Sequence, residues 1–171
     1  MDEKIIEHIS STPVLLMCGI SGSGKTMLSQ RLERQYGFVR ISVDEMIWEK
    51  YGANFVELPF EERRRIFMSI DKDMEHRMEN LLDRGNKVVV DATMCRRAKR
   101  DSMREMCRMK GIEPLIVYLQ ASLPLLRRRL SQRKGVGPND QIVAPPHLEM
   151  YFSNFERPMP DEDAYVITQT I

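Results

Sequence analysis

Short apolar runs recur along the chain, and longer stretches with apolar residues at helical spacing lie between them. A short, continuous apolar run is typical of a strand that is buried on both faces of a sheet. Strands are predicted on this basis over residues 14–18, 38–43, 87–91, 115–119 and 164–168. Alternation of such strands with helices is typical of an α/β fold, in which helices cover both faces of a parallel sheet.

Proline, charge and glycine mark the ends of the predicted helices. Leu-Pro-Phe-Glu-Glu at residues 58–62 favours a helix start, because proline is tolerated in a first turn and carboxylates favour its positive end. That helix is expected to run to Leu82, with Gly85 at its C-cap. A second helix is predicted over about 97–110. A third starts at residues 122–124 and carries Arg127, Arg128, Arg129 and Arg133.

Residues 135–140, Gly-Val-Gly-Pro-Asn-Asp, break this pattern directly after the arginine-rich helix. Such flexible and turn-forming residues predict a mobile loop, and a lid loop is expected over about 134–143. A loop of this kind can close over a bound ligand and exclude water from it. The alternative is an ordinary surface turn.

Residues 19–26, Gly-Ile-Ser-Gly-Ser-Gly-Lys-Thr, fit the phosphate-binding loop pattern G-x-x-x-x-G-K-[ST] without a gap. A predicted strand precedes the loop and a predicted helix follows it, which is the context in which this pattern binds phosphate. The alternative is a glycine-rich turn that carries Lys-Thr by chance. The candidate residues for binding the phosphates are Gly19, Ser21, Gly22, Ser23, Gly24, Lys25 and Thr26.

The residue types in this loop explain how it would hold phosphate. Glycines let the backbone turn so that successive N–H groups point at one anion. Lys25 would add a positive charge at the β- and γ-phosphates, and the hydroxyl of Thr26 is the expected protein ligand of Mg²⁺. The helix that begins here would direct the positive end of its dipole toward the phosphates.

Two carboxylates lie at the carboxyl ends of predicted strands, where doubly wound sheets place their ligands: Asp91 ends one strand and Asp44 comes just after another. Asp44 is the candidate base that accepts the proton of a substrate hydroxyl, and the alternative is that it caps the next helix. Asp91 is expected to hold Mg²⁺ through water or to orient the substrate, and here too a helix cap is the alternative. Glu45 is expected to point elsewhere and to be solvated.

Arg129 and Arg133 are four residues apart, so they are expected to share one helix face aimed at the phosphates from the side opposite Lys25. Arginine at that place stabilises the charge of the transition state. Arginines on helices are also commonly solvated, and we assign that state to Arg127 and Arg128. The basic segment 96–110 offers a surface for an anionic substrate, but its interspersed acids favour a solvated helix start.

Composition limits the domain organisation and the class of protein. A chain of 171 residues with 42% apolar content is expected to form a single domain over 1–171, with 1–12 as an N-terminal extension. No apolar stretch approaches the roughly 20 residues of a membrane span, and no signal-peptide layout is present, so a cytoplasmic protein is expected. Three cysteines without paired metal-ligand spacing argue against a disulfide scaffold or a zinc site.

Together these residues resemble the small P-loop kinases related to polynucleotide kinase, zeta toxins and chloramphenicol phosphotransferase. The resemblance runs from about 14 to 166 and rests on the phosphate-binding loop, on residues 41–45, 89–93 and 155–158, and on the Arg129-x-x-x-Arg133 pair. It implies a P-loop NTPase kinase-like three-layer fold, with a five-stranded parallel sheet of order 2-3-1-4-5 and a helical lid. It also implies ATP and Mg²⁺, with Asp44 as the acceptor-activating carboxylate and Arg129 and Arg133 in the lid.

Two positions depart from the polynucleotide kinases. Those enzymes have an arginine three residues after the Asp44 equivalent and an asparagine after Asp-x-Thr, whereas this chain has Ile47 and Met94. Nucleic acid is therefore a possible partner but not the favoured one. Residues 130–135 are also similar to the lid of gluconate kinases, although the middle of the chain is not.

The sequence therefore predicts an ATP-dependent phosphotransferase that moves the γ-phosphoryl group to a hydroxyl of a small-molecule or nucleotide-like acceptor. Its acceptor pocket is expected between residues 45 and 82, where Trp48, Tyr51, Phe55 and Phe60 are available to stack on a substrate, although core packing is the favoured role for these aromatic residues. Two alternatives stay open: an ATP-binding regulatory or switch protein with weak hydrolysis, and a polynucleotide 5′-hydroxyl kinase. A GTP switch would carry Asn-Lys-x-Asp, which the sequence lacks.

Overall fold

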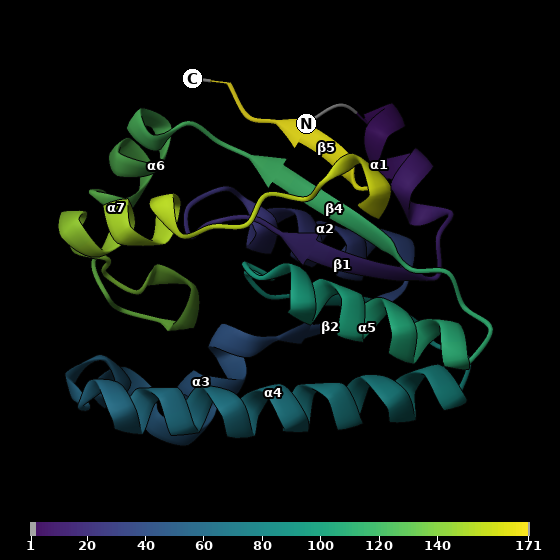
Figure 1. Cartoon of the computed structure of the whole chain (residues 1–171), viewed down its shortest axis with the longest axis horizontal. Coiled ribbons are helices and arrows are strands. Elements are labelled where there is room, and N and C mark those ends of the chain that lie inside the picture. Colours follow the sequence, from purple (N-terminus) through teal and green to yellow (C-terminus); the bar gives the residue numbers. More distant parts are fainter. Residues whose placement is uncertain (1–2, 171) are drawn as a thin grey trace.

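A parallel five-stranded sheet forms the centre of the computed structural model, which describes residues 3–170 (Figure 1). The strand order is β2-β3-β1-β4-β5, as the sequence predicted, and the strand ends differ from the prediction by one residue at most. The strands are β1 Val14–Cys18, β2 Phe38–Ser42, β3 Lys87–Asp91, β4 Leu115–Gln120 and β5 Tyr165–Thr168.

Helices follow every strand except the last. They are α1 Glu3–Ser10, α2 Lys25–Tyr36, α3 Val43–Tyr51, α4 Phe60–Asp83, α5 Arg97–Met109, α6 Leu123–Leu130 and α7 Pro145–Ser153. Short 3₁₀ helices lie at η1 Gly52–Glu57, η2 Pro138–Asp140 and η3 Pro160–Glu162. Helix α4 begins directly after Pro59 and ends two residues before Gly85, whose positive φ of 73° closes the helix in the left-handed conformation.

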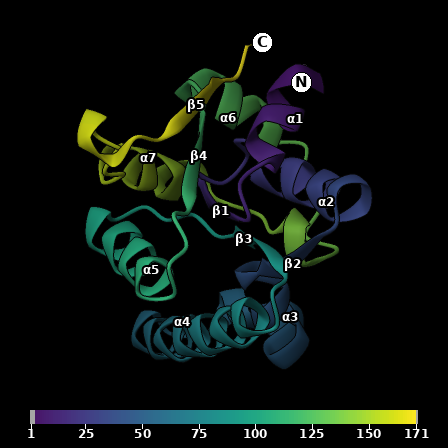
Figure 2. The same ribbon diagram turned by 90° about the vertical axis from the view of Figure 1, so that its right-hand side faces the viewer.

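The helices cover both faces of the sheet (Figure 2). Leu15 and Met17 of β1 pack with α1 and α2, whereas Val14, Leu16 and Cys18 share a core with α4 and α5 on the other face. All five side chains are fully buried. Burial on both faces explains why this strand is a continuous apolar run and not an alternating one.

The segment expected as an N-terminal extension contributes to the core. Ile6 and Ile9 of α1 are fully buried in the same cluster as Leu28 and Leu32 of α2. Glu3 at the start of α1 forms an ion pair with Arg31 of α2. Helix α1 is therefore an integral part of the layer that α2 forms. Across residues 3–170, no helix combines the length and apolar character that crossing a membrane requires.

The sheet register sets the place of the site. Residues of β1 pair with β3 on one side and β4 on the other, so the loop after β1 emerges between the ends of its neighbours. Ser42 at the end of β2 lies opposite Asp91 at the end of β3. The loop 19–26, Asp44 and Asp91 thus meet at the carboxyl edge of the sheet, which is where this fold class places its ligands.

Candidate active site

The loop 19–26 wraps tightly at the end of β1. Gly19 has a φ of 145°, and a Cβ there would lie 2.7 Å from Ser23 Oγ and 2.8 Å from the carbonyl oxygen of Leu119. The Gly19 amide donates to the carbonyl of Thr93, 3.1 Å away. Only glycine fits this position, because any side chain would clash with fixed backbone as well as with Ser23.

Lys25 is the first residue of α2, and its side chain turns back into the loop. The residue is 8% exposed, and Nζ donates to the carbonyl oxygen of Ile20 at 3.1 Å. Burial lowers the pKa of Lys25, while the carboxylates of Asp91 and Asp44 act in the opposite direction. A buried ammonium that is held by a neutral carbonyl gains most from an anion brought into the loop.

Arg129 approaches the loop from α6. Its Nη1 donates to the carbonyl oxygen of Gly22 at 3.0 Å, and Nη2 donates to Gln169 Oε1 at 3.4 Å. Both partners are neutral oxygens, so the positive charge of Arg129 is available to an anion in the loop.

Arg133 does not share a helix face with Arg129, and that prediction is wrong. Helix α6 ends at Leu130, and Arg133 lies in the turn that follows, where its Nη1 donates to the carbonyl oxygen of Gln141 at 3.0 Å. Burial lowers the pKa of Arg133, and the nearby charges of Asp44 and Asp140 oppose that shift. Arg133 therefore reaches the site from the loop between α6 and α7, next to Asp44.

Neither Asp44 nor Asp91 is a helix cap. Asp44 lies inside the first turn of α3, whose N-cap is Ser42, and the N-cap of α5 is Arg96. The capping alternatives for both aspartates are therefore wrong.

Asp91 is buried at the base of the site, and Asp44 lies at its mouth. Asp91 Oδ2 accepts hydrogen bonds from Ser29 Oγ at 3.0 Å and from Arg40 Nη1 at 3.3 Å. Asp44 is accessible to solvent, but surrounding protein reduces its hydration and raises the pKa of its carboxyl, against the lowering effect of Lys25 and Arg133. A raised pKa suits a carboxylate that must accept a proton.

Arg40 and Glu45 belong to the site, although the sequence analysis did not include them. The expectation that Glu45 is solvated is wrong, because its carboxylate accepts from Arg40 at 2.5 and 2.6 Å and from Asn139 Nδ2 at 2.8 Å. Burial would raise the pKa of Glu45, but these hydrogen bonds outweigh it and lower that pKa. The sequence feature that could have identified Arg40 as a site residue is its place between Val39 and Ile41 in strand β2.

The donor set fits a nucleoside triphosphate with Mg²⁺. Lys25 and Arg129 contact the loop, Arg133 lies close enough for its charge to act on Lys25, and among residues 3–170 none of the three forms an ion pair with a carboxylate. Thr26 supplies a hydroxyl, and Asp91 has a second carboxylate oxygen beyond the one that accepts its two hydrogen bonds. Hard oxygen donors of these kinds are the ligands that Mg²⁺ prefers.

Comparison with known proteins places this arrangement in a family. The sequence model of the AAA domain family AAA_33 matches residues 14–158. The chain belongs to this family. It is a P-loop kinase, and the kinases of this group use ATP, typically with Mg²⁺.

Three relatives show how far the likeness extends. The kinase is 26% identical over 165 residues to deoxyguanosine kinase of Bacillus subtilis (strain 168), covering 86% of this chain and 79% of the relative. It is 31% identical over 138 residues to shikimate kinase 2 of Sodalis glossinidius (strain morsitans), covering 81% and 74%. The fold matches an unliganded sugar kinase from Janibacter sp. HTCC2649 with a TM-score of 0.68 and 21% identity, over 92% of this chain and 85% of the other.

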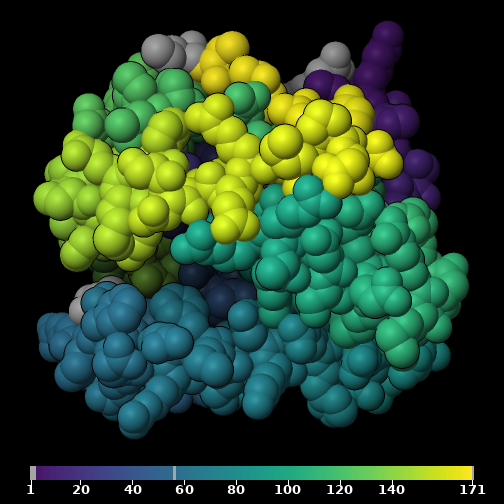
Figure 3. Space-filling model, viewed as in Figure 1, coloured from purple at the N-terminus to yellow at the C-terminus, as the bar shows by residue number. Residues whose placement is uncertain are grey.

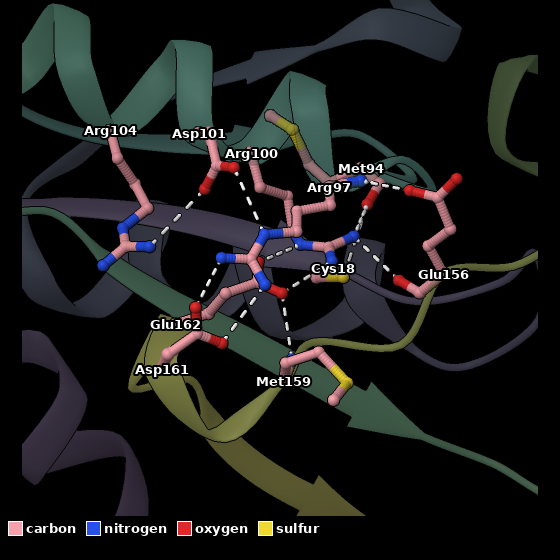
Figure 4. Close-up of polar contacts among 10 residues, drawn as sticks. All are labelled: Cys18, Met94, Arg97, Arg100, Asp101, Arg104, Glu156, Met159, Asp161 and Glu162. Atoms are coloured by element: carbon pink, nitrogen blue, oxygen red, sulfur yellow. Dashed lines mark hydrogen bonds and ion pairs between the residues drawn. The ribbon is translucent and has the colours of Figure 1, made fainter.

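The basic segment of the kinase is solvated only in part, because Arg96 is exposed whereas Arg100 is fully buried and makes the polar contacts drawn in Figure 4. Its guanidinium donates to both oxygens of Glu162 at 2.6 and 2.9 Å, and to the carbonyl oxygens of Met94 and Glu156. Arg97 forms an ion pair with Asp161 at 2.5 Å. The segment therefore neutralises its charge within the protein and ties α5 to the chain before β5.

Figure 3 shows a hollow on the surface between α4 and α7. Of the aromatic residues expected near an acceptor, Phe55 is a core residue, 5% exposed, that packs edge-on against Phe67 with ring centroids 5.3 Å apart. Tyr51 and Phe60 are 38% and 67% exposed. Tyr51 and Phe60 therefore present aromatic surface to solvent.

Proposed function

We propose that the kinase transfers the γ-phosphoryl group of ATP, bound with Mg²⁺, to a hydroxyl of a small-molecule or nucleotide-like acceptor, and that residues 1–171 act as a single kinase domain. The observation that carries the proposal is the convergence of three cations held by neutral oxygens, Lys25, Arg129 and Arg133, on a loop that ends beside Asp44 and Asp91. The three cations suit a polyanion such as a triphosphate, and Asp44 suits a hydroxyl-bearing acceptor.

In this proposal the residues of the loop bind and orient the triphosphate. Lys25 would give up its hydrogen bond to the carbonyl oxygen of Ile20 and bind phosphate oxygens instead. Arg129 would likewise exchange its hydrogen bond to the carbonyl oxygen of Gly22 for phosphate oxygens. Thr26 and Asp91 would hold Mg²⁺, which supplies positive charge to the phosphates when bound. Ser29 and Arg40 keep the Asp91 carboxylate in place through their hydrogen bonds to Oδ2.

Asp44 acts on the acceptor. As the acceptor oxygen forms its bond to the γ-phosphorus, the bond from that phosphorus to the bridging oxygen breaks, and Asp44 accepts the proton of the hydroxyl. Arg133 lies next to Asp44, so it would meet the negative charge that builds on the transferring group. The loop that carries Arg133 would exclude water from the same place.

The names of the two relatives favour a small acceptor. One acts on deoxyguanosine and the other on shikimate, and both are small molecules with hydroxyl groups. Charge supports the same choice, since Arg97 and Arg100 of the basic segment are paired with carboxylates. A polynucleotide acceptor needs a free basic track for its phosphates.

The test is ADP release from MgATP by the purified chain in the presence of different acceptors. The panel contains nucleosides, shikimate, sugar acids, aminoglycoside- and phenicol-type antibiotics and a 5′-hydroxyl oligonucleotide, with a no-acceptor control. Stimulation by one small-molecule class, abolished by Lys25→Met, is the expected result. Stimulation by the oligonucleotide alone would replace the proposal with a polynucleotide 5′-hydroxyl kinase. Slow hydrolysis that no acceptor changes would favour the switch protein.

A further inference from the structure

A row of polar contacts leads from Asp91 at the base of the site to the loop between α6 and α7. Arg40 on β2 donates to Asp91 through Nη1 at 3.3 Å, and its Nη2 contacts both oxygens of Glu45 at 2.5 and 2.6 Å. Glu45 accepts in turn from Asn139 Nδ2 at 2.8 Å. The row joins β3, β2, α3 and η2, and its directly bonded residues Glu45 and Asn139 are 94 positions apart in the sequence.

We propose that Glu45, held in place by Arg40, is a positioning residue that fastens the lid segment 131–144 over the site through Asn139. This inference rests on the proposed function, because it assigns the lid to the same phosphoryl-transfer site. Glu45 follows Asp44 directly on α3, and successive residues of a helix point about 100° apart. One carboxylate thus serves the acceptor while its neighbour holds the lid.

The lid segment is built to move as a unit. Asp140 Oδ2 accepts from the backbone N–H groups of Lys134 at 3.0 Å and Val136 at 3.2 Å, and its carbonyl accepts from the Gly135 N–H at 3.0 Å. These bonds fix the turn internally. A contact at Asn139 therefore positions the rest of the turn as well.

Arg133 gains its position from this turn. It directly precedes Lys134, and its guanidinium donates to the carbonyl of Gln141 on the far side of the turn. Fastening Asn139 to Glu45 accordingly sets how close Arg133 lies to Asp44.

The chemistry of the contact is directional. An ionised carboxylate only accepts hydrogen bonds, so Asn139 must turn its NH₂ group toward Glu45. Within residues 3–170, the buried Oδ1 of Asn139 has no hydrogen-bond partner. The bond to Glu45 is therefore what orients this amide. The competing explanation is that Arg40 and Glu45 form an ion pair that only ties β2 to α3.

The test exchanges the donor and the acceptor. Asn139→Asp keeps the size of the side chain but places two carboxylates against each other, which should open the lid. Combining it with Glu45→Gln restores a donor on α3 facing an acceptor on the lid. Asn154→Asp makes the same chemical change at an exposed residue outside the lid and is the matched control.

The readout is the rate of trypsin cleavage after Arg133 and Lys134, measured without ATP or acceptor, with thermal unfolding as the check on folding. We expect Asn139→Asp to raise that rate about tenfold, as for loss of a hydrogen bond to a charged group, and the double variant to lower it again. The control should cleave like the natural chain.

The proposal that Glu45 holds the lid segment through Asn139 would be overturned by an unchanged cleavage rate in Asn139→Asp, or by a double variant that is cleaved as fast as the single variant. Neither measurement requires that an acceptor be known. Failure of this proposal is therefore distinct from failure of the proposed function, which the acceptor panel decides.

Discussion

Two clusters of basic side chains in this kinase differ in the partners of their positive charges. At the phosphate-binding loop, Lys25, Arg129 and Arg133 each donate to neutral oxygens. On α5, Arg100 is fully buried against both oxygens of Glu162 (Figure 4). Among residues 3–170, no carboxylate lies within hydrogen-bonding distance of the three cations in the first cluster, whereas Arg100 is paired directly with Glu162.

The pKa shifts of two arginines express this difference. Burial lowers the pKa of Arg133, and Asp44 and Asp140 do not compensate for it. Burial also acts to lower the pKa of Arg100, but the hydrogen bonds that Arg100 donates to Glu162 and the charge of that carboxylate outweigh it, and the pKa is raised. Burying a charge is costly unless it is paired. A buried cation with its own carboxylate is structural, and one without a carboxylate marks a place for an anionic ligand.

The strongest test of this comparison removes the charge of Lys25. We expect Lys25→Met to lower kcat/KM by about 10³-fold or more, as for other groups that stabilise phosphoryl transfer. Urea unfolding should show unchanged or higher stability, because a buried ammonium without a carboxylate is removed. Lys50→Met, at an exposed ion pair with Asp73, is the control and should keep full activity. Loss of stability in Lys25→Met would make Lys25 a structural residue.

Asp44→Asn tests the carboxylate at the mouth of the site. We expect kcat to fall about 10²- to 10⁴-fold, the range for a lost general base, while ATP affinity is kept. Steady-state kinetics and ATP titration separate the two effects. An equal loss of ATP affinity would assign Asp44 to nucleotide binding instead.

In the paired cluster, the expected loss is one of stability. Glu162→Gln leaves Arg100 buried without a counter-charge and should lower the free energy of unfolding by about 3–5 kcal/mol. Glu149→Gln, at the exposed ion pair with Arg127, should cost less than about 1 kcal/mol. Urea unfolding measures both. Equal small effects would show that burial does not distinguish the two ion pairs.

The smallest expected effect is the pH dependence that Asp44 contributes. Its raised pKa means that kcat/KM should fall, as the solution is made more acid, at a pH above the ordinary value of 3.8. The folded state also holds this proton more tightly than the unfolded state, so stability should decline as pH rises from 3.8 through the raised pKa. Asp44→Asn should lose this decline. A pH profile of unfolding that is identical in both proteins would contradict the shift.

Contiguous patterns explain which parts of the site the sequence could predict. The loop 19–26 is one unbroken segment after a strand, Asp91 is the last residue of β3 and Asp44 lies two residues after β2, so chain position alone locates them. The end of α6 was missed because no glycine or proline follows until Gly135. Leu130 packs beside the loop, 3.2 Å from where a Cβ of Gly22 would lie, and the chain turns there to place Arg133 in the site.

The burial of Arg100 could have been predicted from the spacing of residues along α5. Arg100, Met103 and Cys107 are buried and follow helical spacing, so the arginine lies on the apolar stripe of α5 and not on its solvated face. Its partner Glu162 is 62 residues away, and no local pattern identifies it.

The sequence by itself determined the fold class, the strand order by resemblance, the phosphate-binding loop and the two aspartates, because each depends on periodicity or on neighbours along the chain. Only the tertiary structure decided which carboxylate pairs with which arginine. Arg40 meets Asp91 and Glu45, Asn139 meets Glu45, and Arg133 meets no carboxylate within hydrogen-bonding distance among residues 3–170. The physical reason is that the pairing of a buried charge depends on which side chains the fold brings together in space. Those side chains are far apart along the chain, so no local sequence pattern identifies the pairs.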